Sequence, residues 1–236
     1  MYNLLISIAT AVAVTFAFGF LLGGGELRIW WGVLPGVISF FVAYILLARR
    51  SLRAVQAIIA RAQNEFQSQN IDRGIQTLKE AYGVGKWQFL VTSQVDGQIG
   101  SVLYMAQRFD EAESYLKRSF KKNWVARAML ATLYYKRKKY DKMETIFEEA
   151  VAANKKESLL WNLYAYCLWK SGNRDKAIAV LNRAVEKIGA DKRTEKNLKA
   201  LQNGRKMKMR GWNHAWYQFH LDRPPAQRQQ VQFRRR

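Results

Sequence analysis

The sequence predicts an all-α protein in which an N-terminal two-helix transmembrane hairpin is followed by an α-solenoid of helical repeats. Three observations lead to this fold class: two uncharged apolar runs near the start, a pattern of small and large apolar residues that recurs three times, and an excess of Lys and Arg only after residue 48. Apolar residues form 49% of the 236 residues, which excludes a disordered polyelectrolyte. The single Cys167 excludes a disulfide framework.

Residues 1–48 form the predicted hairpin, with spans at about 4–22 and 29–48. Their only charged side chains are Glu26 and Arg28, so the net charge of +21 lies wholly in the later residues. A run of about 20 apolar residues is long enough as a helix to cross a bilayer. A cleavable signal peptide and a buried soluble helix are the alternatives for the two runs. A start without Lys or Arg and an immediate second run favour the hairpin.

The flanking charges predict the orientation of this multi-pass membrane protein. Arg49, Arg50 and Arg53 follow the second run, against the lone Arg28 between the runs. Positive residues favour the cytoplasmic side, so we expect both termini to be cytoplasmic. Small residues recur along both runs and predict either packing within the hairpin or a seam between copies of the chain. These residues are Ser7, Ala11, Thr15, Gly19, Gly23, Gly32, Gly36, Ser39 and Ala43.

Residues 49–204 are expected to form cytoplasmic helical repeats that end in a capping helix at 192–206. Three segments share one pattern, with a small residue in each first helix and a small or thin one in each second helix. The shared positions are Gly100, Ala131 and Ala165, then Ala112, Met143 and Ala177. The predicted turns are 106–108, 137–139 and 171–173, of which only Ser171-Gly172-Asn173 has strong turn chemistry. A degenerate earlier unit is expected over 55–88.

This pattern resembles the tetratricopeptide repeat, and a generic helical array is the alternative. The third unit is the best match, and all three lack the closing Pro of the family. Its matching residues are Trp161, Tyr164, Ala165, Leu168, Gly172, Ala177, Leu181 and Ala184. Together with two spans, the repeats resemble HemY-type bacterial inner-membrane proteins. That resemblance implies a scaffold at the inner membrane and no catalytic activity.

The residues themselves offer no catalytic constellation, so we predict no enzyme activity, no cofactor and no metal. The run Gly83-Val84-Gly85-Lys86 lacks the preceding strand and the following Ser or Thr of a phosphate loop. Cys167 has no His within the repeats to activate it. His214 and His220 are six residues apart and do not share a helical face.

Binding is the function that remains, and first helices line the groove of tetratricopeptide arrays. By position, the groove would be aromatic with cationic ends, which suits an apolar peptide bearing carboxylates. Ordinary repeat packing is the alternative for each of its residues. The expected groove residues are Tyr104, Met105, Thr132, Tyr135, Lys136, Asn162, Tyr166, Trp169 and Lys170.

The C-terminal segment 205–236 carries nine Lys and Arg against Asp222, with interleaved aromatic residues. We rank three uses: packing of Trp212, Trp216 and Phe219 as a last helix with a flexible tail from about 224, then membrane contact, then RNA binding. The expected contacts to lipid or an anionic partner are Arg49, Arg50, Arg53, Arg210, Trp212, Trp216, Arg234, Arg235 and Arg236.

The leading hypothesis is therefore a non-enzymatic, membrane-anchored scaffold that binds and organises partner proteins at the cytoplasmic face of the inner membrane. Protein partners and membrane lipid are expected, and self-association through the small-residue faces of the spans is an option. The alternative is a basic adaptor that binds RNA, ribosomes or anionic lipid at the membrane.

Overall fold

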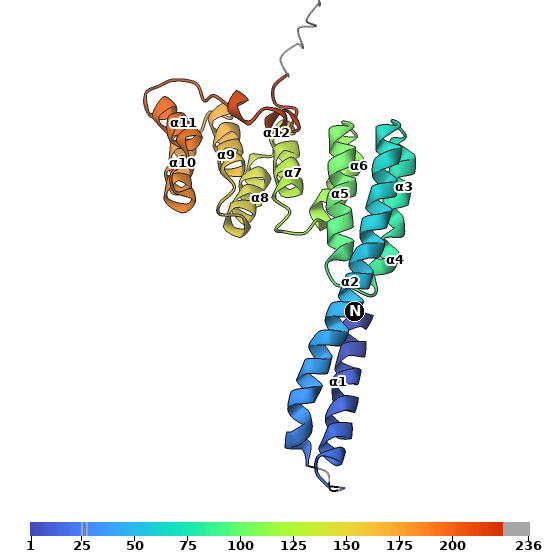
Figure 1. The fold of residues 1–236 in the computed structure, drawn as a ribbon. Helices are drawn as coiled ribbons and strands as arrows, with labels where there is room; N and C mark the ends of the chain where they lie inside the picture. Colours follow the sequence, from blue (N-terminus) through green and yellow to red (C-terminus); the bar gives the residue numbers. More distant parts are fainter. Residues whose placement is uncertain (25, 27, 224–236) are drawn as a thin grey trace, which may run out of the picture. The chain divides into compact units, whose positions relative to one another are not determined.

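The computed structural model describes residues 1–24, 26 and 28–223, and all regular structure among them is helical (Figure 1). The chain divides into two compact units. Unit 1 holds residues 1–102 and 118–120, and unit 2 holds residues 103–117 and those from 121 onward. This confirms the predicted all-α fold with two apolar helices at its N-terminus. The first helices are α1 (Tyr2–Leu21), α2 (Ile29–Gln67), α3 (Ile71–Glu80), α4 (Tyr82–Gly85) and α5 (Val91–Met105).

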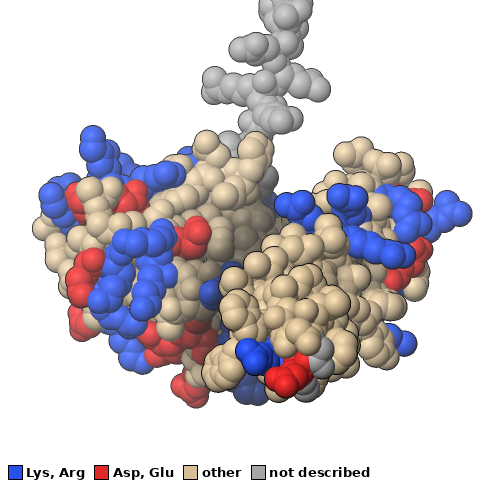
Figure 2. All heavy atoms as spheres, turned by 60° about the horizontal axis from the view of Figure 1, so that its bottom comes forward, with Lys and Arg blue, Asp and Glu red and all other residues tan. Residues whose placement is uncertain are grey.

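Helices α1 and α2 pair as a hairpin whose surface is apolar. In the most apolar stretch of each helix only 11% of the residues are buried, and both helices are long enough to cross a membrane. Figure 2 shows a broad uncharged surface over the hairpin, whereas Lys, Arg, Asp and Glu cover much of the rest of that view. The two helices approach closely at Gly32, where an added Cβ would lie 1.8 Å from the carbonyl oxygen of Thr15. The small residues of α2 are therefore used within the hairpin.

The second helix does not end where the apolar run ends. The predicted hairpin ends at residue 48, and its second helix is expected to run on through Val55, Ile58 and Ala62; α2 does continue as one helix of 39 residues to Gln67. Its later half buries Val55, Ile58 and Ala62, and it pairs with α3. This pair lies where the degenerate earlier unit was expected. The helix continues because its inward face stays apolar after the first arginines.

Polar side chains gather where the first turn of α1 lies beside α2. The buried amide of Asn3 donates to the hydroxyl of Ser51 at 2.8 Å and to the side-chain oxygen of Gln88 at 3.2 Å. The amide of Gln88 donates to the hydroxyl of Tyr44 at 3.3 Å. Backbone carbonyls after α4 accept the first free amides of α1, which caps that helix. These contacts fix the end of the hairpin that is remote from its loop.

Unit 2 contains the second and third of the helical pairs that the repeat pattern predicts, whereas Gly100 and Ala112 of the first pair belong to different units. Within each pair the expected small or thin residues, such as Ala131 with Met143 and Ala165 with Ala177, are fully buried. The rings of Phe147 and Tyr164 stack with centroids 4.9 Å apart and join one pair to the next. The helices are α6 (Phe109–Arg118), α7 (Trp124–Lys136), α8 (Tyr140–Ala153), α9 (Ser158–Lys170), α10 (Arg174–Ile188) and α11 (Lys192–Gln202).

Five helices end in the same backbone motif. After α2, α5, α7, α9 and α11 one residue has a positive φ, and the next residue's amide donates to a carbonyl five residues earlier. This is the Schellman pattern, which favours glycine at the positive-φ position. The five positions are Gln69, Gln107, Lys138, Gly172 and Gly204. Helix α11 thus ends like the first helix of a pair, although no second helix follows it in the described residues.

A segment of residues 205–223, which we call the return segment, takes the place of that second helix. It starts in extended form, with Met207 and Met209 buried and Lys206 and Lys208 exposed. Two short helices follow, η1 (Arg210–Trp212) and α12 (His214–Tyr217). Figure 1 shows the chain running from α11 back past α9 to α7. The last helix that we expected is thus reduced to the four residues of α12, which pack on the first helices of the repeat pairs. The tail expected from about residue 224 lies outside the described residues.

Candidate binding surface

The end of α5, together with α7 and α9, forms a face of unit 2 that the return segment partly covers. At one end, the hydroxyl of the buried Tyr104 donates to the carbonyl oxygen of Phe219 at 2.8 Å. The Tyr104 ring meets the edge of Phe109 at 5.1 Å and lies 5.8 Å from the ring of His220. Burial raises the pKa of Tyr104, so this hydroxyl stays protonated and remains a donor.

Trp216 is the central contact of the return segment. Its side chain is fully buried, and its ring meets the edge of Tyr166 with centroids 4.8 Å apart. One oxygen of Asp222 accepts from the Trp216 indole at 2.9 Å, and the other accepts from the Tyr166 hydroxyl at 3.3 Å. Burial, with a smaller effect from the Asp222 charge, raises the pKa of Tyr166. Asp222 thereby ties the end of the segment to α9.

A buried polar network holds the first part of the return segment. Asn162 in α9 donates to the hydroxyl of Thr194 at 2.8 Å and accepts from the amide of Asn197 at 2.9 Å. The side-chain oxygen of Asn197 in turn accepts from the backbone amide of Lys208 at 2.8 Å. All three side chains in this network are almost fully buried. Each is therefore costly to leave unpaired, and the network fixes the path of the segment over α9 and α11.

The structure corrects part of the predicted groove. Tyr104, Thr132, Asn162 and Tyr166 are buried, so a partner has no access to them in this conformation. At Thr132 ordinary repeat packing explains the residue, because its hydroxyl bonds to the carbonyl of Ala128 within α7. The remaining predicted groove residues keep exposed surface: Met105, Lys136 and Lys170 are exposed, and Tyr135 and Trp169 are half-buried.

The residues predicted to contact lipid or an anionic partner also differ in their exposure. Trp216 was expected to meet lipid or an anionic partner, and this is wrong for the described conformation because its ring is buried in unit 2. Trp212 is half-buried beneath the guanidinium of Arg193, 5.2 Å from its ring centroid. The other described members of the set, Arg49, Arg50, Arg53 and Arg210, are exposed. The members Arg234, Arg235 and Arg236 lie outside the described residues.

A hollow of about 380 Å³ remains open between α9 and the return segment. Tyr166, Trp169 and Lys170 line one side of it, and the segment with Asp222 lines the other. The ammonium of Lys170 lies 4.8 Å from the centroid of Trp169, and that of Lys136 lies 4.6 Å from the centroid of Phe109. Such cation–π pairs keep a positive charge beside an aromatic surface. Burial lowers the pKa of Lys136.

The reactive side chains near this surface are placed for packing. Cys167 is fully buried in α9, and burial raises its pKa, so its thiol is a poor nucleophile. Burial, with the nearby Lys136 charge, lowers the pKa of His220 and favours its neutral form. No group of three His, Cys, Asp or Glu that could hold a metal occurs in residues 1–24, 26 and 28–223. The arrangement presents apolar, aromatic and cationic surface that can bind a partner.

Sequence reasoning missed how the return segment is fixed. Asp222 stood out only as the one acid of a basic segment, and Asn197 looked like one polar residue of a capping helix. One signal was present, because Asn197 follows Thr194 by three residues and precedes Leu201 by four, which places it on the inward face of α11. The pairing of Asp222 with Tyr166 spans 56 residues and leaves no local pattern.

Comparison with known proteins identifies the repeats. Residues 103–165 and residues 159–186 each match a family model described as tetratricopeptide repeat. No curated protein matches the chain. The matched residues run from the end of α5 to α10 and include α7 and α9, whose faces the return segment partly covers.

Proposed function

We propose that this tetratricopeptide-repeat chain is a non-enzymatic scaffold, anchored in a membrane by α1 and α2, that binds and organises partner proteins at the cytoplasmic face. Tetratricopeptide repeats are protein-interaction modules, and residues 103–186 carry them. The observation that carries the proposal is the combination of these repeats with two apolar helices in one chain. On the HemY-type resemblance, the membrane is the bacterial inner membrane.

Three features support the membrane anchor. The apolar stretches of α1 and α2 are almost entirely exposed, which is costly in water and favourable in lipid. A polar cluster around Asn3 and Ser51 marks the end of the hairpin that is remote from its loop. Exposed Arg49, Arg50 and Arg53 follow at the same level of α2, where positive charge favours the cytoplasmic side.

The accessible part of the face formed by the end of α5, α7 and α9 is the proposed partner site. Its residues are Met105, Tyr135, Lys136, Trp169 and Lys170, around and beside the hollow on α9. Half-buried aromatic rings are typical anchors for an apolar side chain, and the two lysines can pair with carboxylates at the rim. The partner expected from this chemistry is a peptide segment with apolar side chains and acidic neighbours.

The test is capture of partners from native membranes by the full chain in mild detergent. We compare wild type with the variant Tyr135→Ala, Trp169→Ala, Lys170→Ala, and with the control variant Lys155→Ala, Lys156→Ala in the turn before α9. The groove variant should lose its specific partners and the control should keep them. An unchanged partner list for a folded groove variant would contradict the proposed site. Release of the chain from membranes by an alkaline wash would contradict the anchor.

A further inference from the structure

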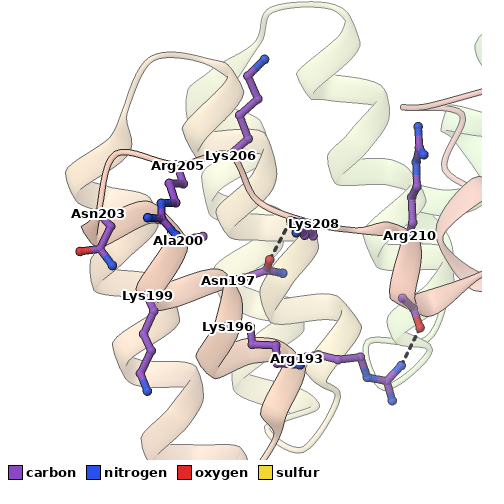
Figure 3. Close-up of a pocket in the computed structure, with 11 residues that line it drawn as sticks. Arg193, Lys196, Asn197, Lys199, Ala200, Asn203, Arg205, Lys206, Lys208 and Arg210 are labelled. Atoms are coloured by element: carbon purple, nitrogen blue, oxygen red, sulfur yellow. Dashed lines mark hydrogen bonds between the residues drawn. The ribbon is translucent and has the colours of Figure 1, made fainter.

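A second hollow in unit 2 lies between α11 and the return segment, and its lining is cationic. It has a volume of about 540 Å³, and seven of its eleven lining residues are Lys or Arg while none is Asp or Glu (Figure 3). The cations come from both walls. Those used below are Arg193, Lys196 and Lys199 from α11, and Lys206, Lys208 and Arg210 from the return segment.

The two walls expose these cations for different geometric reasons. On α11, the exposed Arg193, Lys196 and Lys199 are spaced three residues apart, so they lie along one side of the helix. In the return segment, alternation buries Met207 and Met209 and turns Lys206, Lys208 and Arg210 outward. Figure 3 shows Lys196 and Lys199 on α11 and Lys206 and Arg210 on the facing segment.

Hydrogen bonds hold the walls in place. The side chain of Asn197 accepts from the backbone amide of Lys208, and the guanidinium of Arg193 donates to the carbonyl of Gly211 at 3.0 Å (Figure 3). The positive-φ turn at Gly204 joins α11 to the segment. The hollow is thus formed before any ligand arrives, which lowers the entropic cost of binding.

Arg193 lies 4.0 Å from the carboxylate of Asp191, but most of the positive charge of this hollow is not paired with carboxylates as it is in the repeats. In the repeats, Arg137, Arg183 and Lys176 each pair with a carboxylate of a neighbouring helix. Within the described part of the chain, Lys196, Lys199 and Lys206 pair with none. Residues 191–210 hold eight Lys and Arg against Asp191 and Glu195, a net charge of +6. The 80 residues 109–188 hold seventeen Lys and Arg against ten Asp and Glu, a net charge of only +7 over four times the length. An anion in the hollow would relieve this repulsion.

We propose that this hollow binds a compact ligand that carries two or more phosphate groups. Its volume lies within the range of small-molecule sites, roughly 300–1,000 Å³. Arg and Lys together are the side chains that recognise clustered phosphate oxygens, by paired hydrogen bonds and by point charges. A concave site suits a compact ligand that fits inside it better than it suits a partner with a flat surface. A free polyphosphate and a phosphorylated lipid headgroup share this chemistry.

The test uses calorimetric titration of the full chain in uncharged detergent with tripolyphosphate. The site variant is Lys196→Gln, Lys199→Gln, Lys206→Gln, and these three exposed side chains make no hydrogen bond within the described residues. The control is Lys142→Gln, Lys155→Gln, Lys156→Gln, which removes the same charge from exposed positions outside the hollow. We expect one site per chain, at least tenfold weaker binding in the site variant, and near wild-type binding in the control.

Three results would overturn the proposal: no binding at low salt, equal weakening in both variants, or binding of single-stranded RNA through the hollow without any binding of tripolyphosphate. The source of the phosphate follows from a second measurement in phosphatidylcholine nanodiscs. If cardiolipin, whose headgroup carries two phosphates, weakens tripolyphosphate binding more than phosphatidylglycerol of equal total charge does, in wild type and control alike, a lipid headgroup competes for the hollow. If the two lipids have the same effect, the hollow binds a free ligand.

Discussion

The hairpin α1–α2 and the repeat helices α7–α10 bury opposite kinds of side chain. In residues 1–48 of the hairpin the buried positions are small or polar, such as Asn3, Ser7 and Gly32, and most large side chains are exposed. In the repeats the buried positions include Phe147 and Tyr164, whereas the surface carries ion pairs between neighbouring helices. Both are antiparallel helical pairs with short connections.

The contrast shows that the pairing of helices is common to both regions and that the surroundings of each region decide which side chains face outward. Water favours burial of large apolar groups, so the repeats gain stability from the area they bury. Lipid, in which the proposed anchor would lie, gives no such driving force between helices, so there the hairpin would depend on close backbone approach at small residues. Each region should therefore fail under a different perturbation.

The largest effect is expected from Trp216→Ala in the return segment. The change removes a fully buried side chain. It leaves Asp222 without the indole N–H that donates to it and Tyr166 without its ring contact, so unit 2 should lose about 3–5 kcal/mol of unfolding free energy. Urea unfolding of the full chain in mild detergent measures it. Trp30→Ala is the matched control, because Trp30 in the hairpin is 89% exposed. Equal losses of unfolding free energy for the two variants would contradict the view that only the repeats depend on burial of large side chains.

The next effect is expected from Gly32→Ala in the hairpin. The added Cβ would meet the backbone of Thr15 at 1.8 Å and 2.7 Å, so the two helices must move apart at a cost of about 1–3 kcal/mol. The measurement is the fraction of SDS at the unfolding midpoint of the hairpin. Gly83→Ala in α4 is the control, since an added Cβ there meets nothing within 4 Å. If both variants unfold together with wild type, close approach at Gly32 is not what holds the hairpin.

The smallest effect is the loss of stability at low pH that follows from protonation of the ion-paired Glu113 in the repeats. Lys117, with Arg137 and Tyr134, holds the pKa of Glu113 at about 2, below its ordinary 4.5 and against the opposing effect of burial. The stabilisation is complete above pH 4.5 and is lost as the pH falls toward 2. At pH 7, Glu113→Gln should cost about 1–2 kcal/mol.

Thermal unfolding of unit 2 from pH 7 to pH 2 tests this expectation. The loss of stability between pH 4.5 and pH 2 should be smaller in Glu113→Gln than in wild type. The hairpin offers an internal reference, because the ion pair of its loop, Arg28 with Glu26, is exposed. A wild-type profile that does not differ from that of the variant would show that Glu113 adds no pH-dependent stability.

Much of the fold was predictable because it is set by local patterns. Uncharged runs predicted the two hairpin helices, and the spacing of small and large residues predicted the helical pairs. At Gly172 the turn was visible in the sequence itself, whereas Gln107 and Lys138 adopt the same positive φ without a turn signal. Those two turns were placed only through the repeat alignment, since their shape comes from the flanking helices and not from the residue.

The candidate surface was only partly predictable. The first helices do contribute the expected face, but the sequence of the return segment has no periodicity that says where it packs. Its basic composition suggested contact with lipid, yet Trp216 and Phe219 are fully buried. Their burial depends on Tyr104 and Tyr166, which are far away in the sequence and become neighbours only after the repeats have formed.

The order of the repeats and the return segment along the chain also has a consequence for biosynthesis. Because chains fold progressively as they leave the ribosome, the repeats up to α10 emerge before the residues that cover them. Tyr104 and Tyr166 therefore stay uncovered until Phe219 and Asp222 have been translated. During that interval the nascent chain presents an aromatic face that chaperones can recognise. A chain terminated early, before Trp216, would keep that face and should be a substrate for quality control.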